Sequence, residues 1–258
     1  MEASLEVRLF ERGSHALKLT HEGRALFERT ETLLAELGEA VTAIAAGGET
    51  PRGRLRVSAP LLFSQTAVGT LSARFALRYP EVRLEITTED RAVDMVEEGY
   101  DLVIRVNPDP NEQLIGRVLL RDRLVAVASP ELQRPAADVP VPAVVRVSSN
   151  QSSWDLATHE GDLRVSIDPI LRLGSLIMIR DAVRTGIGAA VLPLSLVAGD
   201  LRTGTLVHWG DGKGPPIEIW ALYPSRRLLS ARVSAFLEFL KEAFPLGQPE
   251  ELAAYIKS

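Results

Sequence analysis

The chain has 258 residues, enough to bury the core of one large domain or of two smaller ones. Its 46% hydrophobic and 24% charged content is ordinary for a soluble globular protein, and a net charge of −5 provides no overall attraction for nucleic acid. The lack of cysteine excludes disulfides, thiolate metal sites and a cysteine nucleophile. Because the sequence has no run of eighteen apolar residues and no signal-peptide pattern, we expect a cytoplasmic protein without membrane contact.

Two short alternating stretches near the N-terminus predict a β-hairpin. Arg8–Phe10 and Ala16–Leu19 surround the polar turn Gly13-Ser14-His15, and Thr20 has the position of a helix N-cap. A hairpin this short is not stable by itself, so it belongs to a larger unit. Three of its side chains can meet DNA phosphates: Arg12, His15 and Lys18. The alternative is a solvated turn, which charge alone favours.

A long helix is predicted from Thr20 to Ala46, where Gly47-Gly48 ends it. Apolar or small side chains recur at steps of three and four residues, the spacing of a coiled coil, at Leu26, Thr30, Leu33, Leu37, Val41 and Ile44. We therefore expect a helix that dimerises through Leu26, Leu33, Leu37 and Ile44. The alternative is a helix that lies across its own domain.

After the linker Gly47–Gly53, short apolar runs alternate with amphipathic segments. The expected strands are Leu55–Ala59, Arg83–Thr87, Leu102–Val106, Leu124–Ala128, Val144–Val147, Ala189–Leu192, Leu206–Trp209 and Ile217–Tyr223. The expected helices are Ser64–Tyr79, Arg91–Glu98, Leu176–Arg184 and Ala231–Phe244. This order favours an α/β fold of two subdomains with a cleft between them, the first containing a parallel sheet.

The sequence offers no catalytic constellation, no metal site and no cofactor motif. Its four histidines, His15, His21, His159 and His208, have no metal-ligand spacing. Gly186 and Gly188 follow a predicted helix and precede a strand, the reverse of a dinucleotide-binding turn, so we assign them to the end of the helix and a tight turn. An enzyme built from scattered residues is the alternative.

An ordered set of segments resembles the LysR-type transcriptional regulators. Leu9-Phe10-Glu11-Arg12 and Leu19-Thr20-His21-Glu22-Gly23 are similar to the wing of that family's winged helix-turn-helix, and Gly53–Pro60 is similar to the entry into its effector domain. Later landmarks follow in the family's order: Tyr100–Val106, Val125–Leu132 and Ile179–Val197. The resemblance covers nearly the whole chain.

The resemblance implies two Rossmann-like subdomains of the type 2 periplasmic-binding-protein kind, preceded by a wing remnant and a linker helix. The expected divisions are 1–19 for the wing, 20–52 for the linker helix and hinge, and 53–258 for the effector-binding domain, with 53–122 and 223–258 in subdomain I and 123–222 in subdomain II. The family's recognition helix precedes the wing, so we expect an N-terminally truncated regulator that binds DNA weakly. It should form a homodimer or homotetramer. The alternative is a solute-binding protein of the same fold without a DNA role.

The effector is expected between the subdomains, at the carboxyl ends of the strands. A helix beginning near Ser64 and another after Ser175 offer N–H groups that favour an anionic effector, although Ser64 also fits a plain N-cap. Arg105 ends a buried strand and meets either a ligand carboxylate or a structural salt-bridge partner. The predicted contacts are Leu62, Phe63, Ser64, Gln65, Arg105, Val106, Ser148, Ser149, Ser175 and Leu176. Trp154 belongs to this wall or to a core, and closure is expected about strands near Val106 and Leu222.

Overall fold

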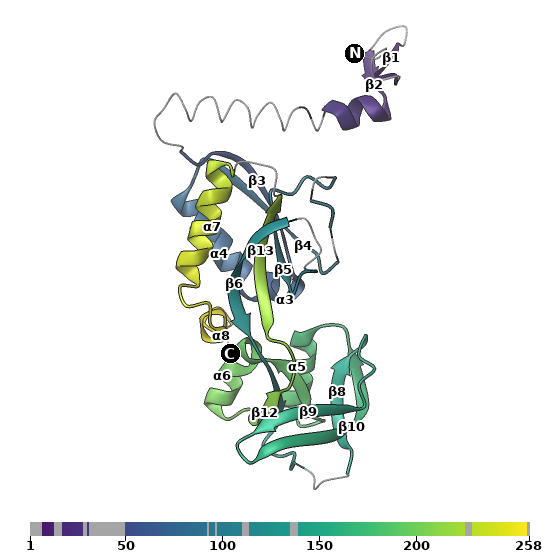
Figure 1. Ribbon diagram of the computed structural model, residues 1–258, viewed down its shortest axis with the longest axis vertical. Coiled ribbons are helices and arrows are strands. Elements are labelled where there is room, and N and C mark those ends of the chain that lie inside the picture. The colour runs from purple at the N-terminus through teal and green to yellow at the C-terminus, as the bar shows by residue number, and fades with distance from the viewer. Residues whose placement is uncertain are drawn as a thin grey trace.

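The N-terminal hairpin is present, with its first strand shifted by two residues. The computed structural model describes residues 7–12, 17–27, 30, 50–91, 93–95, 97–109, 114–134, 139–224 and 229–256 (Figure 1). Strand β1 (Phe10–Arg12) pairs antiparallel with β2 (Leu17–Leu19). Thr20 caps the following helix at residues 21–27, because its Oγ1 accepts a hydrogen bond from the Gly23 N–H at 2.9 Å. Several predicted contacts lie outside the described residues. They are Leu33, Leu37 and Ile44 of the dimer seam, and His15 with the side chains of Arg12 and Lys18 in the hairpin.

The first subdomain contains a mixed five-stranded sheet. Its strands are β3 (Gly53–Ala59), β4 (Val82–Thr88), β5 (Leu102–Val106), β6 (Leu114–Asp122) and β13 (Ile217–Pro224). They lie in the order β4-β3-β5-β13-β6, with β3 parallel to β4 and β5, and β13 antiparallel to β5 and β6. The predicted parallel unit is therefore confirmed for β3, β4 and β5. The chain adds β13 to this sheet after it has formed the second subdomain.

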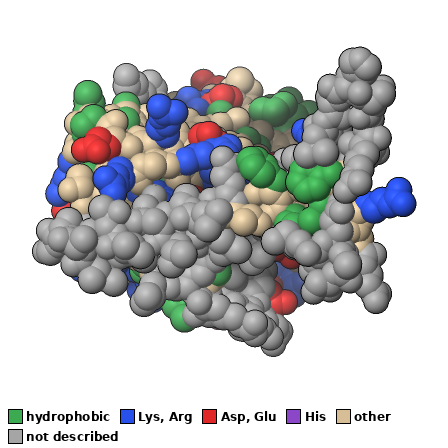
Figure 2. All heavy atoms as spheres, turned by 90° about the horizontal axis from the view of Figure 1, so that it is seen from above, with side chains coloured by type: hydrophobic (Ala, Val, Ile, Leu, Met, Phe, Trp, Pro, Cys, Tyr) green, Lys and Arg blue, Asp and Glu red, His purple; other side chains and the backbone are tan. Residues whose placement is uncertain are grey.

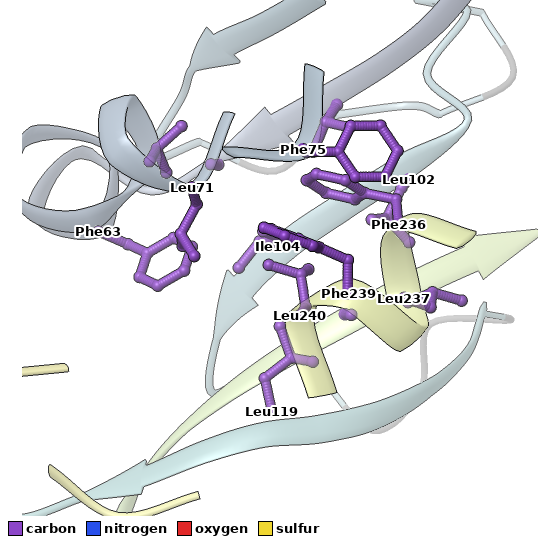
Figure 3. Close-up of a cluster of buried hydrophobic side chains, with 14 of the residues drawn as sticks. Phe63, Leu71, Phe75, Leu102, Ile104, Leu119, Phe236, Leu237, Phe239 and Leu240 are labelled. Atoms are coloured by element: carbon purple, nitrogen blue, oxygen red, sulfur yellow. The ribbon is translucent and has the colours of Figure 1, made fainter. Parts of the chain in front are cut away.

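Aromatic packing between two helices fixes the core of this subdomain, which we call the first core and which includes Phe63, Phe75 and Leu102. One continuous helix is formed by α3 (Leu61–Phe63), the π-helical η1 (Ser64–Val68) and α4 (Gly69–Arg78), and α7 (Ala231–Ala243) lies beside it on the sheet (Figure 1). Phe75 of α4 meets Phe236 of α7 edge to face at 4.9 Å between ring centroids, and Phe239 at 5.4 Å (Figure 3). The N- and C-terminal parts of the domain thus share one core.

The second subdomain contains a six-stranded sheet with two helices. Its strands are β7 (Leu124–Ala128), β8 (Val141–Arg146), β9 (Ser153–Thr158), β10 (Gly161–Leu173), β11 (Ala190–Pro193) and β12 (Val207–Gly212), in the order β11-β7-β12-β9-β10-β8. Helices α5 (Leu176–Arg184) and α6 (Leu194–Thr203) follow β10 and β11. A cluster that we call the second core includes Val125, Ile179 and Leu192. Trp154 lies in a separate core at 5% exposure, which decides between its two predicted places.

The chain crosses between the subdomains at two points. It leaves the first sheet between Asp122 and Leu124, and it returns between Gly212 and Ile217. The expectation that the crossings lie near Val106 and Leu222 is wrong, because both residues are inside strands of the first sheet. The predicted boundary at 222/223 likewise falls within β13. The reason is that β6, an edge strand carrying Arg117 and Arg121, was not recognised from the sequence.

The predicted helix Arg91–Glu98 is not formed in its described residues, which are turns and irregular chain. The Asp94 carboxylate accepts a hydrogen bond from the Glu97 N–H at 2.9 Å, and the Glu98 carboxylate accepts one from the Asp94 N–H at 3.2 Å. Such side-chain bonds to the backbone compete with helical ones. Arg91 also binds Glu98 through both terminal nitrogens, at 2.9 and 2.7 Å, which closes the loop on itself.

Gly186 and Gly188 have the roles predicted for them, at the end of α5 and in the tight turn after it. Gly186 has φ +82° and its N–H donates to the Val183 carbonyl at 3.0 Å, so it ends the helix in the left-handed conformation. A Cβ on Gly188 would come within 2.8 Å of the Pro142 carbonyl oxygen, which requires glycine for the close approach to β8. The two glycines therefore serve chain geometry.

Candidate effector site

The helix that starts the predicted site begins three residues earlier than expected. Pro60 directly precedes α3, so Ser64 lies one turn inside the helix and its N–H donates to the Pro60 carbonyl at 2.9 Å. The first N–H, that of Leu61, donates to the Asp90 carboxylate at 2.9 Å. The expectation that the helix begins near Ser64 with unpaired N–H groups is therefore wrong, and so is the alternative of Ser64 as an N-cap. Asp90, from the loop after β4, performs the capping instead.

Only part of the predicted apolar wall is available. Phe63 is 2% exposed and packs in the first core, with its ring 6.0 Å from that of Phe244, so it cannot line a cleft (Figure 3). Leu62, in contrast, is partly buried and packs against the second core. Gln65 is exposed to solvent. Leu62 thus reaches from the first subdomain across to the second.

Arg105 lies at the end of β5 on the sheet face opposite the first core. Its Nη1 donates to the Ile104 carbonyl at 2.8 Å, and its Nη2 donates to the Ser58 hydroxyl at 3.2 Å, with Ser58 fully buried. The hydrogen bond from Arg91 holds the pKa of Glu98 below its ordinary value, and the charge of Arg105 adds to this effect. Arg105 therefore sits in a polar setting held by β3 and the loop after β4. The next residue, Val106, is 45% exposed.

In the second subdomain, the start of α5 is built as the sequence predicts. Ser175 is the N-cap, and its Oγ accepts a hydrogen bond from the Ile177 N–H at 3.2 Å. Leu176 packs against the second core, the same cluster that receives Leu62. The starts of α3 and α5 therefore each pack a leucine against the surface of the same apolar cluster.

The remaining predicted residues are not joined to that surface by the described contacts. Ser148 is exposed. Ser149 belongs to a turn, where its Oγ accepts from the Gln151 N–H at 3.4 Å and its carbonyl accepts from Arg172 Nη1 at 2.5 Å. Asp90 and Ser58 are the polar residues that the sequence reasoning missed. Their signal was present, because each lies at the carboxyl end of a recognised strand of the first sheet.

A cavity of about 240 Å³ lies elsewhere, between β6 and the chain after α7. Its lining includes three cations, none of them predicted as effector contacts: Arg117, Arg121 and Lys241. These side chains form ion pairs with glutamates, Arg117 and Lys241 with Glu238 and Arg121 with Glu218. We do not assign the effector to this cavity, because all its lining residues belong to the first subdomain, so a ligand there would not touch the second.

A buried carboxylate sits at the first crossing. Asp122 is 5% exposed and accepts hydrogen bonds from the N–H groups of Arg123 at 2.7 Å and Ser195 at 3.3 Å. Burial raises the pKa of Asp122, and these hydrogen bonds oppose the rise only in part. Because Ser195 lies in the first turn of α6, the carboxylate fastens that helix to the crossing.

The described side chains on one face of the molecule show charges of both signs. On the face that Figure 2 shows, Lys and Arg side chains lie next to Asp and Glu side chains among the described atoms. Within the described residues, no group of three His, Asp or Glu side chains is arranged to hold a metal ion. The described helices include none with the length and apolar character needed to cross a membrane.

Fold and crossing pattern define a two-subdomain regulatory domain of the periplasmic-binding kind. The LysR substrate binding domain family matches residues 48–245, and the chain belongs to the LysR family of transcriptional regulators. The HTH-type transcriptional regulator PtxR of Pseudomonas aeruginosa is 30% identical over 264 residues, which cover 97% of this chain and 85% of PtxR. DmlR of Escherichia coli, also an HTH-type transcriptional regulator, is 28% identical over 96% of this chain and 84% of its own.

Solved structures agree with this assignment. CrgA, a LysR-type transcriptional regulator from Neisseria meningitidis, superposes with a TM-score of 0.65 at 25% identity, covering 93% of this chain and 85% of CrgA. The chain is therefore a transcriptional regulator with an effector-binding domain, and the solute-binding alternative is not supported.

Proposed function

We propose that this regulator senses a small organic anion where α3 and α5 begin, and that the bound anion changes the angle between the subdomains. The observation that carries the proposal is that Leu62 of the first subdomain and Leu176 of the second both pack against the second core. A ligand at this place touches both subdomains at once. Its binding energy can therefore favour one relative orientation over another.

An anion is favoured by the groups around this surface. The first N–H of α3, that of Leu61, is already bound by the Asp90 carboxylate, so the start of α3 contributes the apolar side chain of Leu62 and no attraction for an anion. Ser175 caps α5, whose N-terminus provides a positive dipole end. Arg105 supplies a guanidinium at the end of β5 that can turn toward a carboxylate. We include Leu62, Ser64, Gln65, Arg105, Val106, Ser148, Ser149, Ser175 and Leu176 in the proposed site, and we exclude Phe63.

The remaining functional proposals follow from family membership and sequence pattern. We propose that the chain acts without catalysis, in the cytoplasm, as a dimer or tetramer assembled through the helix of residues 20–46. The hairpin residues Arg12, His15 and Lys18 would then touch DNA phosphates in a salt-sensitive way. We retain the division of the effector domain into two subdomains and place its boundaries at the two crossings.

A thermal-shift screen of small carboxylates, with the corresponding amides as neutral controls, tests the proposed function. We expect one or more acids, and not their amides, to raise the unfolding temperature, because a ligand that binds the folded state stabilises it. The best acid is then titrated calorimetrically into Ser64→Ala, Arg105→Ala and Ser175→Ala variants of confirmed fold. Weaker binding in at least one variant supports the site, and wild-type affinity in all three would show that the site is misplaced.

A further inference from the structure

The chain after α7 is fastened to the first subdomain. The Gly247 carbonyl accepts a hydrogen bond from the Arg121 N–H of β6 at 2.8 Å, and Gly247 has φ +63°, a conformation that favours glycine. Helix α8 (Pro249–Ala253) follows, with a capping box between Gln248 and Glu251. Leu252 is 1% exposed in the first core, and the ring of Tyr255 lies 5.8 Å from that of Phe244.

The same short segment also contacts the second subdomain. Helix α8 packs against α6, and Ile256 packs against the second core. In Figure 1, α8 and α6 lie together at the narrow waist of the molecule, on the other side of the crossing strands from α3 and α5. Residues 249–256 thus form a bridge between the subdomains that is separate from the two crossings. We call these residues the C-terminal bridge.

Helix α6 connects the C-terminal bridge to the first crossing. Its first N–H, that of Leu194, donates to the Arg123 carbonyl at 2.8 Å, and the next, that of Ser195, donates to the Asp122 carboxylate. One end of α6 is therefore tied to the first crossing while α8 packs against the helix. A rotation about the crossings has to slide α6 along α8 or part the two helices.

We propose that the C-terminal bridge sets the angle between the subdomains, by adding a contact that is separate from the two crossing strands of the hinge. Two subdomains joined by crossing strands alone are expected to rotate relative to each other. Contacts at α8 and Ile256 limit that rotation on the side of the waist opposite Leu62. The LysR substrate binding domain match ends at residue 245, so the bridge lies outside the matched segment. The link to effector sensing rests on the proposed function, but the restriction of the hinge does not.

The test measures the distance between the subdomains without any effector. Because the chain has no cysteine, Leu77→Cys on α4 and Val147→Cys beyond β8 provide two labelling sites, exposed by 85% and 62% in the parent chain. Spin labels on the full chain, diluted with unlabelled chain to suppress contacts between copies, report the distance distribution. Ile256→Asp places a charge on the second core, whereas the matched control Ala254→Asp places it at an exposed position of the same segment.

We expect Ile256→Asp to broaden the distance distribution and shift its mean, with Ala254→Asp matching the parent. Circular dichroism confirms that each variant is folded, and the milder Ile256→Ala replaces Ile256→Asp if the latter does not fold. A distribution unchanged in the folded Ile256 variant overturns the proposal, as does equal broadening in Ala254→Asp. Effector affinity is measured separately, so a misplaced effector site leaves this outcome unaffected.

Discussion

Loss of Arg184 should destabilise the second subdomain more than loss of its partner Asp200. The two residues join α5 to α6, with Arg184 Nε and Nη2 each 2.8 Å from Asp200 Oδ1. The side chain of Asp200 is 5% exposed and that of Arg184 is 28% exposed. Arg184→Met strands a buried carboxylate, at a cost of about 3 kcal/mol in the free energy of unfolding. Asp200→Asn leaves a guanidinium that still reaches solvent and Asp181, at a cost of about 1 kcal/mol.

Urea unfolding followed by tryptophan fluorescence measures both losses. Trp154 and Trp209 are buried in the second subdomain, and a Trp220→Phe background removes the signal of the first. The double variant should lose less than the sum of the single variants, since neither charge is then left behind. Equal losses, or a larger loss for Asp200→Asn, would refute the argument that burial of the carboxylate decides the cost.

Four further outcomes are expected. Replacing Leu33 and Leu37 by Glu should turn a dimer into monomers in sedimentation velocity, and a monomeric parent at micromolar concentration contradicts the predicted seam. Lys18→Glu should weaken binding to duplex DNA and flatten its salt dependence in fluorescence anisotropy; an unchanged slope argues against a phosphate contact. Because the pKa of Asp122 is raised in the folded state, the contribution of this group to stability is present at low pH and is lost as pH rises through the folded-state pKa. Asp122→Asn should reduce this pH dependence of the unfolding free energy, and an unaltered pH profile would argue against the raised pKa. Asp90→Ala should cost about 1 kcal/mol of unfolding free energy through the lost cap, whereas no measurable loss means that the contact is not stabilising.

Strongly patterned elements could be predicted from the sequence. The helix α5 has the predicted bounds, since Ser175 and Gly186 mark its two ends. Buried strands such as β5 and β7 could be predicted because they are short runs of mostly apolar residues.

Elements whose pattern is mixed escaped prediction. β6 carries arginines because it is an edge strand, and β10 contains Pro169 at an irregularity in its register. The loop from Arg91 to Glu98 has helical spacing, but its side chains bind its own backbone. For the site, sequence placed Ser175 correctly at a helix start, but the cap by Asp90 and the burial of Phe63 depend on contacts distant in sequence.

The most direct test of the central claim is methyl NMR of leucine-labelled protein, titrated with the carboxylate that raises the unfolding temperature most. We expect the methyl signals of Leu62 and Leu176 to shift together with increasing ligand, because both pack against the second core where the anion is proposed to bind. Shifts confined to Leu119 and Leu246, which line the cavity beside β6, with Leu62 and Leu176 unchanged, would contradict it.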